Sequence, residues 1–353
     1  MVLLFFSMIA CSLFEKKRPI LAPQLRFPLT KEMDVVFEGK INQELIKDEK
    51  KIYFSTTKGC LYSMDDPEDG LKLLYQSEVG FVSPPYIHEK YIFIYDSKNH
   101  IYCLDKKGRL VWKNHVDEKI TSGIQAETEK IYFGTQEGHL LSYRAESGEQ
   151  IWKIKTKAPI HSLPLVVQDT IIFGCDDYHL YFLNRDGNLE SRYETGGKIR
   201  GSLTYKNNFL YFGSYDEYFY CFNLDKNKIK WRVKAGGKVD TYPLIYQNYV
   251  LFTAWNNVLF CLNNKNGTVL WWNQLPARCL YRMELVGNQL LVPSLSSILE
   301  CFDIHTGKIL GNYDTEHEIK SNLIWFHSHV LLSVYIKESD SSQILFLGQN
   351  KEE

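Results

Sequence analysis

The chain has 353 residues, of which 41 are Lys or Arg and 42 are Asp or Glu, so its formal net charge is −1. This balance, without long runs of like charge, excludes a polybasic membrane patch and the basic surface typical of nucleic-acid-binding proteins. A hydrophobic share of 44% and an aromatic share of 14% indicate a globular protein rich in strands.

Residues 1–11 predict a signal peptide that ends in a lipidation site. The segment 1–10 is almost entirely apolar, and about ten residues are too few to span a bilayer. Met8-Ile9-Ala10-Cys11 resembles a bacterial lipobox, in which a small residue precedes the cysteine that is lipidated. Met8 and Ile9 depart from the usual residues, and no Lys or Arg precedes the apolar run. We expect lipidation at Cys11; the alternative is an apolar N-terminus with a coincidental cysteine.

Residues 12–32 predict a tether between the lipid and the folded part. They contain the basic run Lys16-Lys17-Arg18 and three prolines, Pro19, Pro23 and Pro28. Such a composition favours an extended linker. The remaining residues, 33–353, are expected to form a single domain, because one repeat runs through them without interruption.

A short apolar phrase recurs eight times in this domain, and its third residues lie 40, 39, 40, 39, 40, 40 and 40 residues apart. Short β-branched and aromatic runs at this period are typical of radially repeated four-stranded blades. The sequence therefore predicts an all-β fold, an eight-bladed β-propeller. The eight phrases are Lys51-Ile52-Tyr53-Phe54, Tyr91-Ile92-Phe93-Ile94, Lys130-Ile131-Tyr132-Phe133, Thr170-Ile171-Ile172-Phe173, Phe209-Leu210-Tyr211-Phe212, Tyr249-Val250-Leu251-Phe252, Gln289-Leu290-Leu291-Val292 and His329-Val330-Leu331-Leu332.

Each phrase is followed by a polar turn, a second apolar run and a turn that commonly ends in glycine. These features predict antiparallel strands joined by tight turns. Four residues beyond the second turn, four of the units carry a tryptophan, which we expect to be a large apolar plate between blades. These structural repeat residues are Trp112, Trp152, Trp231 and Trp271.

The last unit has candidates for only three strands, at 321–326, 329–334 and 343–347. Residues 34–38, Asp-Val-Val-Phe-Glu, resemble the outer strand that contains Trp112, with Phe37 in the tryptophan position. We therefore predict that this N-terminal segment completes the eighth blade and closes the ring, which leaves no long open strand edge.

Cysteines and histidines recur at fixed places in the repeat. Cys103, Cys221, Cys261 and Cys301 share one position, where neighbouring equivalents lie roughly 12 Å apart, too far for disulfides. We expect small buried hydrophobic residues there, whereas one pairing among Cys60, Cys175 and Cys279 stays open. The set His100, His139 and His179 also shares one position, and the same separation argues against a common metal ion.

The pattern from apolar phrase to turn glycine and tryptophan resembles the quinoprotein-like, or PQQ, propeller repeat, most closely at residues 146–152, Glu-Ser-Gly-Glu-Gln-Ile-Trp. It differs from the WD40 repeat, because no repeat tryptophan is followed by Asp. The resemblance covers residues from about 33 to 353. Within this repeat family, length, blade number and the lipobox are most similar to BamB, the lipoprotein class of outer-membrane β-barrel assembly.

That resemblance implies a non-catalytic scaffold, anchored by lipid at the periplasmic face of the outer membrane, that binds a protein partner, without nucleic acid. It implies no cofactor or metal and a monomer within a complex. The alternatives are a PQQ-dependent quinoprotein dehydrogenase, a general ligand-binding propeller and a soluble periplasmic protein. The enzyme class uses a pair of adjacent cysteines and long loops over its cofactor, and this sequence has neither.

Overall fold

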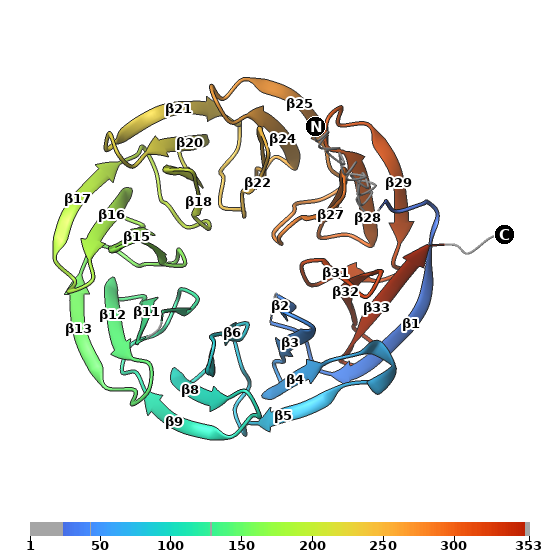
Figure 1. Cartoon of the computed structure of the whole chain (residues 1–353), viewed down its shortest axis with the longest axis horizontal. Coiled ribbons are helices and arrows are strands. Elements are labelled where there is room, and N and C mark those ends of the chain that lie inside the picture. The colour runs from blue at the N-terminus through green and yellow to red at the C-terminus, as the bar shows by residue number, and fades with distance from the viewer. Residues whose placement is uncertain (1–23, 43, 128, 350–353) are drawn as a thin grey trace, which may run out of the picture.

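A computed structural model describes residues 24–42, 44–127 and 129–349. The chain forms a closed ring of eight antiparallel sheets around a central axis, as predicted (Figure 1). None of the described residues forms a helix long and apolar enough to cross a bilayer.

Seven blades are formed by consecutive strands, with the first strand of each nearest the axis and the fourth at the outside (Figure 1). These are β2 (Ile46–Asp48), β3 (Lys51–Ser55), β4 (Cys60–Met64) and β5 (Lys72–Gln76), with the short 3₁₀ helix η1 (Pro67–Asp69) between the last two; β6 (Tyr86–Ile87), β7 (Tyr91–Tyr95), β8 (His100–Asp105) and β9 (Leu110–His115); β10 (Gln125–Ala126), β11 (Lys130–Gly134), β12 (His139–Arg144) and β13 (Gln150–Lys155); β14 (Leu165–Val167), β15 (Thr170–Gly174), β16 (His179–Asn184) and β17 (Leu189–Glu194); β18 (Thr204–Lys206), β19 (Phe209–Gly213), β20 (Tyr218–Asn223) and β21 (Lys228–Lys234); β22 (Leu244–Tyr246), β23 (Tyr249–Thr253), β24 (Val258–Asn263) and β25 (Val269–Gln274); β26 (Glu284–Val286), β27 (Gln289–Pro293), β28 (Ile298–Asp303) and β29 (Ile309–Asp314).

The eighth blade joins the two ends of the domain. Its inner strands β30 (Glu318–Ile319) and β31 (Ile324–Phe326) both pair with β32 (His329–Ile336), which pairs with β33 (Ser341–Gln349). The outer strand is β1 (Leu29–Glu38), which pairs antiparallel with β33 from Leu29 opposite Gln349 to Glu38 opposite Ser341. The predicted closure by the N-terminal strand is confirmed.

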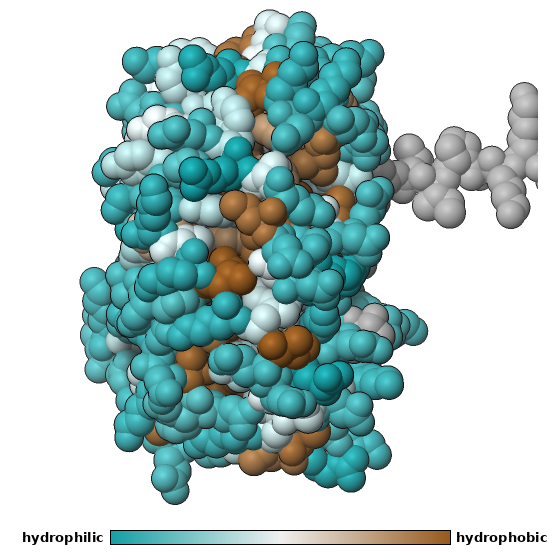
Figure 2. Space-filling view, turned by 90° about the vertical axis from the view of Figure 1, so that its left-hand side faces the viewer, coloured by the Kyte–Doolittle hydropathy of each residue, from teal (hydrophilic) through white to brown (hydrophobic). Residues whose placement is uncertain are grey.

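Burial along the strands explains the sequence pattern. The second and third strands are buried on both sides, so β15 and β16 are continuously apolar through their centres. The outer strands alternate between exposed and half-buried positions, because one side faces solvent. The outer wall is accordingly mostly hydrophilic with scattered apolar groups (Figure 2). Ile151 and Leu189 are among the exposed side chains of the outer strands.

Each repeat tryptophan links its blade to the next. The indole N–H donates to a backbone carbonyl in the following blade, at 2.9 to 3.1 Å, and the ring covers the glycine of that blade's outer turn. A Cβ on that glycine would lie within 2.9 Å of the ring, and the glycine has a positive φ, so both geometry and space require glycine. The pairs are Trp112 with Gly148, Trp152 with Gly187, Trp231 with Gly267 and Trp271 with Gly307.

The register of β1 corrects the prediction for Phe37. In the tryptophan-bearing blades, the tryptophan is the first paired residue after a bulge in the outer strand. In the eighth blade that residue is Met33, opposite Phe346. Phe37 lies four residues further along the same strand, where it is buried against Phe54 of the first blade, with ring centres 4.9 Å apart. The prediction failed because no preceding glycine turn sets the register of β1.

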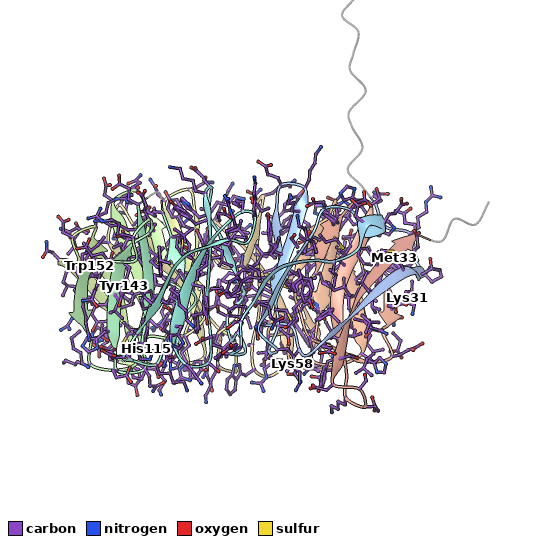
Figure 3. All side chains as sticks on the ribbon, turned by 90° about the horizontal axis from the view of Figure 1, so that it is seen from below. Lys31, Met33, Lys58, His115, Tyr143 and Trp152 are labelled. Atoms are coloured by element: carbon purple, nitrogen blue, oxygen red, sulfur yellow. The ribbon has the colours of Figure 1, made fainter. Side chains whose placement is uncertain are left out.

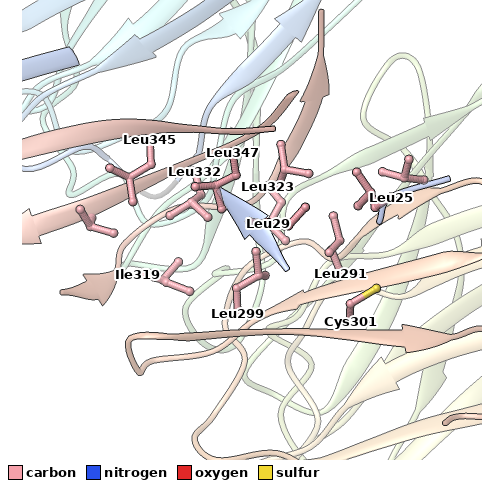
Figure 4. Close-up of a cluster of buried hydrophobic side chains, with 13 residues drawn as sticks. Leu25, Leu29, Leu291, Leu299, Cys301, Ile319, Leu323, Leu332, Leu345 and Leu347 are labelled. Carbon is pink, nitrogen blue, oxygen red and sulfur yellow. The ribbon is translucent and has the colours of Figure 1, made fainter. Parts of the chain in front are cut away.

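The predicted tether is too long at its C-terminal end. Leu25 and Leu29 are buried in the cluster between the seventh and eighth blades (Figure 4). Phe27 packs over Gly311, which occupies the tryptophan position of the seventh blade. Gln289 holds the same segment, because its side-chain amide donates to the Leu25 carbonyl at 2.9 Å. The N-terminal segment thus replaces a tryptophan at the junction where the ring closes.

We expect that a chain beginning at Gly39 will melt at a lower temperature than the full chain and aggregate. Without β1, the paired edge of β33 and the cluster around Leu25 and Leu29 would be exposed. A chain beginning at Gln24 is the control and should melt like the full chain. Thermal melts with light scattering measure both properties, and equal melting of the two truncated chains would contradict closure by β1.

Replacing Trp231, which is 9% exposed, should test the link between blades. We expect Trp231→Ala to lower the free energy of unfolding by about 3–5 kcal/mol. Trp231→Phe, which removes mainly the hydrogen bond to Asn264, should cost about 1 kcal/mol. The control is Trp272→Ala, a 61% exposed site where the change should stay within about 0.5 kcal/mol. Urea denaturation measures the free energy of unfolding of the three variants, and equal losses for Trp231→Ala and Trp272→Ala would refute the link.

Candidate functional site

Two sets of connections meet on one face of the ring, which we call the channel-mouth face. One set joins each outer strand to the next inner strand, and the other joins the second and third strands of each blade. Lys58 and His115 lie toward this face (Figure 3). Backbone hydrogen bonds join the two sets in neighbouring blades, for example from the Tyr215 N–H to the Lys198 carbonyl at 2.9 Å. The face comprises residues 39–42, 44–45, 77–85, 116–124, 156–164, 195–203, 235–243, 275–283 and 315–323 together with 56–59, 96–99, 135–138, 175–178, 214–217, 254–257, 294–297 and 337–340.

The face opens into an axial cavity of about 1130 Å³. Inner-strand side chains such as Tyr86, Gln125 and Leu165 line its wall, and Arg200 and Arg282 lie among its lining residues on the channel-mouth face. The carboxylates along the lining already have partners. Glu44 pairs with Arg282, and Asp240 accepts hydrogen bonds from two aromatic side chains described below. The acidic side chains that line the cavity are therefore engaged by other residues.

The three repeat histidines do not converge. His100 bonds to Asp96 at 3.0 Å, His139 bonds to Glu118 at 2.9 Å, and His179 bonds to the carbonyl of Asp177 at 2.8 Å. In the described part of the chain, no group of three or more metal-ligating side chains comes together. His100 and His179 instead fasten their own turns on the channel-mouth face, whereas His139 is joined to the connection that contains Glu118.

Glu118 is the most strongly shifted carboxylate on this face. Burial opposes its ionisation, but hydrogen bonds from Lys153, Thr135 and His139 outweigh that effect and lower the pKa of Glu118 from 4.5 to about 2. The carboxylate therefore remains charged down to acidic pH. It ties the connection between the second and third blades, in which it lies, to the third blade.

The other predicted residues lie away from the cavity. The four repeat tryptophans and Phe37 lie at the junctions between blades, whereas Cys11 lies outside the described residues. The seven described cysteines are buried and free, so Cys60, Cys175 and Cys279 form no disulfide. Burial raises the pKa of the Cys103 thiol to about 12, which makes it unreactive.

Sequence reasoning missed a group on the channel-mouth face, which we call the cation–aromatic ladder and define as Tyr215, Lys238, Trp255 and Arg278. The Lys238 ammonium lies 5.0 Å from the centre of the Tyr215 ring and 4.7 Å from that of Trp255. The Arg278 guanidinium lies 4.5 Å from the Trp255 ring centre. These distances are typical of cation–π contacts.

Asp240 supports the ladder from within. Its carboxylate accepts hydrogen bonds from the Trp255 indole N–H at 2.7 Å and from the Tyr215 hydroxyl at 2.9 Å. Burial and the Asp240 carboxylate raise the pKa of Tyr215 to about 12, so its hydroxyl stays a neutral donor. One acidic side chain therefore fixes both rings.

The repeat contained a signal for the ladder. Cations occupy the same position in four of the outer-to-inner connections, three of them successive, directly before a buried residue. An alignment of the eight units by position, instead of by strand pattern, would have shown this row of cations on one face. The four are Lys119, Lys198, Lys238 and Arg278.

Toward the fourth blade, two cations of this face are paired with a carboxylate. Arg200 donates to Asp176, and Lys198 lies 3.3 Å from the same carboxylate. Burial opposes ionisation of Asp176, but Arg200 and Lys198 outweigh it and lower its pKa. This cluster, in which Asp176 is buried and both cations are half-buried, is a structural ion-pair network between the fourth and fifth blades. The chemistry that remains open on the channel-mouth face is binding by charge and by aromatic surface.

Comparisons with known proteins agree with this geometry. The family model described as outer membrane protein assembly factor BamB matches residues 99–197 and 185–337. No curated protein matches the sequence. Among solved structures, BamB from Moraxella catarrhalis has a TM-score of 0.76 at 15% identity, covering 92% of this chain and 99% of that one. The computationally designed Ika8 protein has a TM-score of 0.70 at 12% identity, covering 88% and 97%. At these identities, the two structures show the fold alone.

The low pKa of Glu118 predicts how stability depends on pH. A carboxylate whose pKa falls from 4.5 to about 2 on folding stabilises the fold above about pH 4.5, and this stabilisation is lost as the pH falls toward 2. The melting temperature of Glu118→Gln should therefore lie below that of the wild type at pH 7, and the gap should shrink in acid. Glu137→Gln, at an exposed site, is the control and should change little. A gap that does not depend on pH would refute this role.

Proposed function

The chain belongs to the family of the outer membrane protein assembly factor BamB, and from this premise we propose that it is a non-catalytic scaffold. In this role it binds a protein partner, a barrel-assembly protein of the outer membrane, while β-barrel proteins are inserted. The ring acts as a rigid platform and catalyses no reaction.

The observation that carries this proposal is the construction of the channel-mouth face. Short connections from every blade meet there, and backbone hydrogen bonds such as Trp255 N–H to Lys238 carbonyl, at 2.9 Å, hold them in place. Exposed cationic and aromatic side chains therefore keep fixed positions before a partner arrives. Such preorganisation lowers the entropy cost of binding.

The alternative role, a quinoprotein dehydrogenase, fits the residues poorly. Enzymes with this repeat hold pyrroloquinoline quinone and Ca²⁺ near the axis, and this sequence has no pair of adjacent cysteines. The carboxylates along the cavity are engaged, since Asp96 binds His100 and Tyr102, and Glu44 binds Arg282. Reduction of a dye by the purified protein, dependent on added quinone, would support the enzyme and overturn the scaffold.

We further propose that the scaffold is a lipoprotein at the periplasmic face of the outer membrane, anchored through Cys11. The N-terminal segment meets the ring at Leu25, beside Gln289, and β1 runs from there to the channel-mouth face. An anchor upstream of Leu25 therefore leaves that face free for a partner. The alternative is a soluble periplasmic protein without the anchor.

Replacing Cys11 with Ala tests the anchor. The wild type should sediment with membranes, because each buried acyl methylene contributes about 0.8 kcal/mol. The Cys11→Ala chain should be soluble and retain the melting temperature of the wild type. Fractionation and mass spectrometry of the N-terminus measure these outcomes. A wild-type chain that is soluble and keeps Met1 would contradict the anchor.

Recovery of a partner tests the scaffold itself. Affinity purification of the wild type from solubilised membranes should retain an outer-membrane β-barrel assembly protein, identified by mass spectrometry. A barrel-assembly protein that is present in those membranes but absent from the eluate would refute the role.

A further inference from the structure

We propose that the cation–aromatic ladder binds an extended acidic segment of the protein partner, one that combines carboxylates with apolar side chains. This inference rests on the proposed function and specifies the chemistry that the scaffold recognises. It assigns the contact to the fifth and sixth blades, on the channel-mouth face beside the axial cavity.

The ladder is a continuous row of alternating rings and cations. Tyr215 and Trp255 have ring centres 5.5 Å apart at an interplanar angle of 62°, and Lys238 lies against both rings. Arg278 extends the row beyond Trp255. Two cations in such a row can contact successive carboxylates of an extended chain, while the rings offer an apolar surface between them.

The ladder is rigid before any partner binds. Three backbone hydrogen bonds of 2.9 Å tie its connections together: Tyr215 to Lys198, Trp255 to Lys238 and Leu295 to Arg278, each from the N–H to the carbonyl. Asp240 fixes the two rings from the inner side. The side chains of the ladder therefore lose little conformational entropy when a partner binds.

Its cations are available. Lys238 is exposed and Arg278 is half-buried, and among the described residues neither forms an ion pair with a carboxylate. By contrast, Asp176 engages Lys198 and Arg200, and Glu44 engages Arg282. Lys238 and Arg278 thus differ from Lys198, Arg200 and Arg282, and the Asp240 carboxylate beside them is already hydrogen-bonded to both rings.

The charge and the surroundings favour a peptide over a polyanion. Lys238 and Arg278 carry two positive charges and Asp240 carries one negative charge, which leaves the ladder at +1. Phosphate-rich polymers and anionic bilayers are bound by larger clusters of cations. Trp255 and Leu280 are each 38% exposed beside these charges. Aromatic and apolar surface next to a modest positive charge suits a segment of mixed acidic and apolar residues.

A synthetic peptide tests this chemistry without the natural partner. The probe is a fluorescently labelled 12-residue peptide of alternating Glu and Leu, and its counterpart has Lys in place of Glu. Wild-type protein should bind the acidic peptide, measured by fluorescence anisotropy, and Lys238→Glu combined with Arg278→Glu should weaken binding about tenfold or more. Equal binding of both peptides, or equal binding by the double variant, would overturn the proposal.

The matched control reverses two charges of the same blades on the opposite face. Lys226 and Lys265 are exposed in outer turns of the fifth and sixth blades. Lys226→Glu combined with Lys265→Glu should bind the acidic peptide like the wild type. Melting temperatures of both double variants should match the wild type, which separates lost binding from lost folding.

The aromatic part of the ladder has its own test. Trp255→Ala should weaken peptide binding, whereas Trp255→Phe should retain most of it, because Phe keeps a ring beneath the two cations. Trp272→Ala, at another exposed tryptophan, should have no effect. Loss of binding in Trp272→Ala equal to that in Trp255→Ala would overturn the assignment.

Two outcomes distinguish this inference from its premise. If the wild type and the Lys238/Arg278 double variant retain a barrel-assembly protein equally, the ladder is refuted and the scaffold stands. If the wild type retains no barrel-assembly protein yet binds the acidic peptide through the ladder, the scaffold role is refuted and the ladder proposal stands. Equally tight ladder-dependent binding of phosphatidylglycerol vesicles would overturn the choice of a peptide and favour a lipid surface.

Discussion

The contact between an indole ring and the glycine turn of the next blade is the interaction on which the ring depends. Each blade is a twisted sheet with its two central strands apolar on both sides, and it is stable only when neighbours cover them. Trp231 shows how neighbours are held, since its ring covers Gly267 and its N–H is bonded to the carbonyl of Asn264. The glycine accepts both the positive φ and the ring, and no other residue does so without strain.

The seventh and eighth blades show how the position is filled where tryptophan is absent. Gly311 leaves the tryptophan position of the seventh blade empty, and Phe27 from the N-terminal segment fills it. Met33 takes the equivalent place in the eighth blade. Closure therefore brings together residues from the two ends of the domain. The N-terminal segment supplies both the outer strand of the eighth blade and part of the junction between the seventh and eighth blades.

A closed ring of equal repeats places equivalent residues on the same face. The connections that carry Lys198, Lys238 and Arg278 differ in sequence, but their backbones bond to the next turn in the same way. This regularity converts differences between repeats into a surface pattern: cations paired with a carboxylate around Asp176, and cations that contact aromatic rings around Trp255. Family membership and this pattern together favour a binding scaffold over an enzyme.

The sequence by itself determined the blade number, the strand order, the tryptophan repeat and closure by the N-terminal strand, because a constant period and alternating burial are local properties of the chain. Only the tertiary structure decided the register of β1, where Met33 and not Phe37 takes the tryptophan position, since the sequence has no glycine before that strand to mark a turn and set the register. It also decided which cations are free. Lys198 and Lys238 hold the same place in the repeat, and their difference depends on whether a carboxylate from another segment, such as Asp176, reaches them.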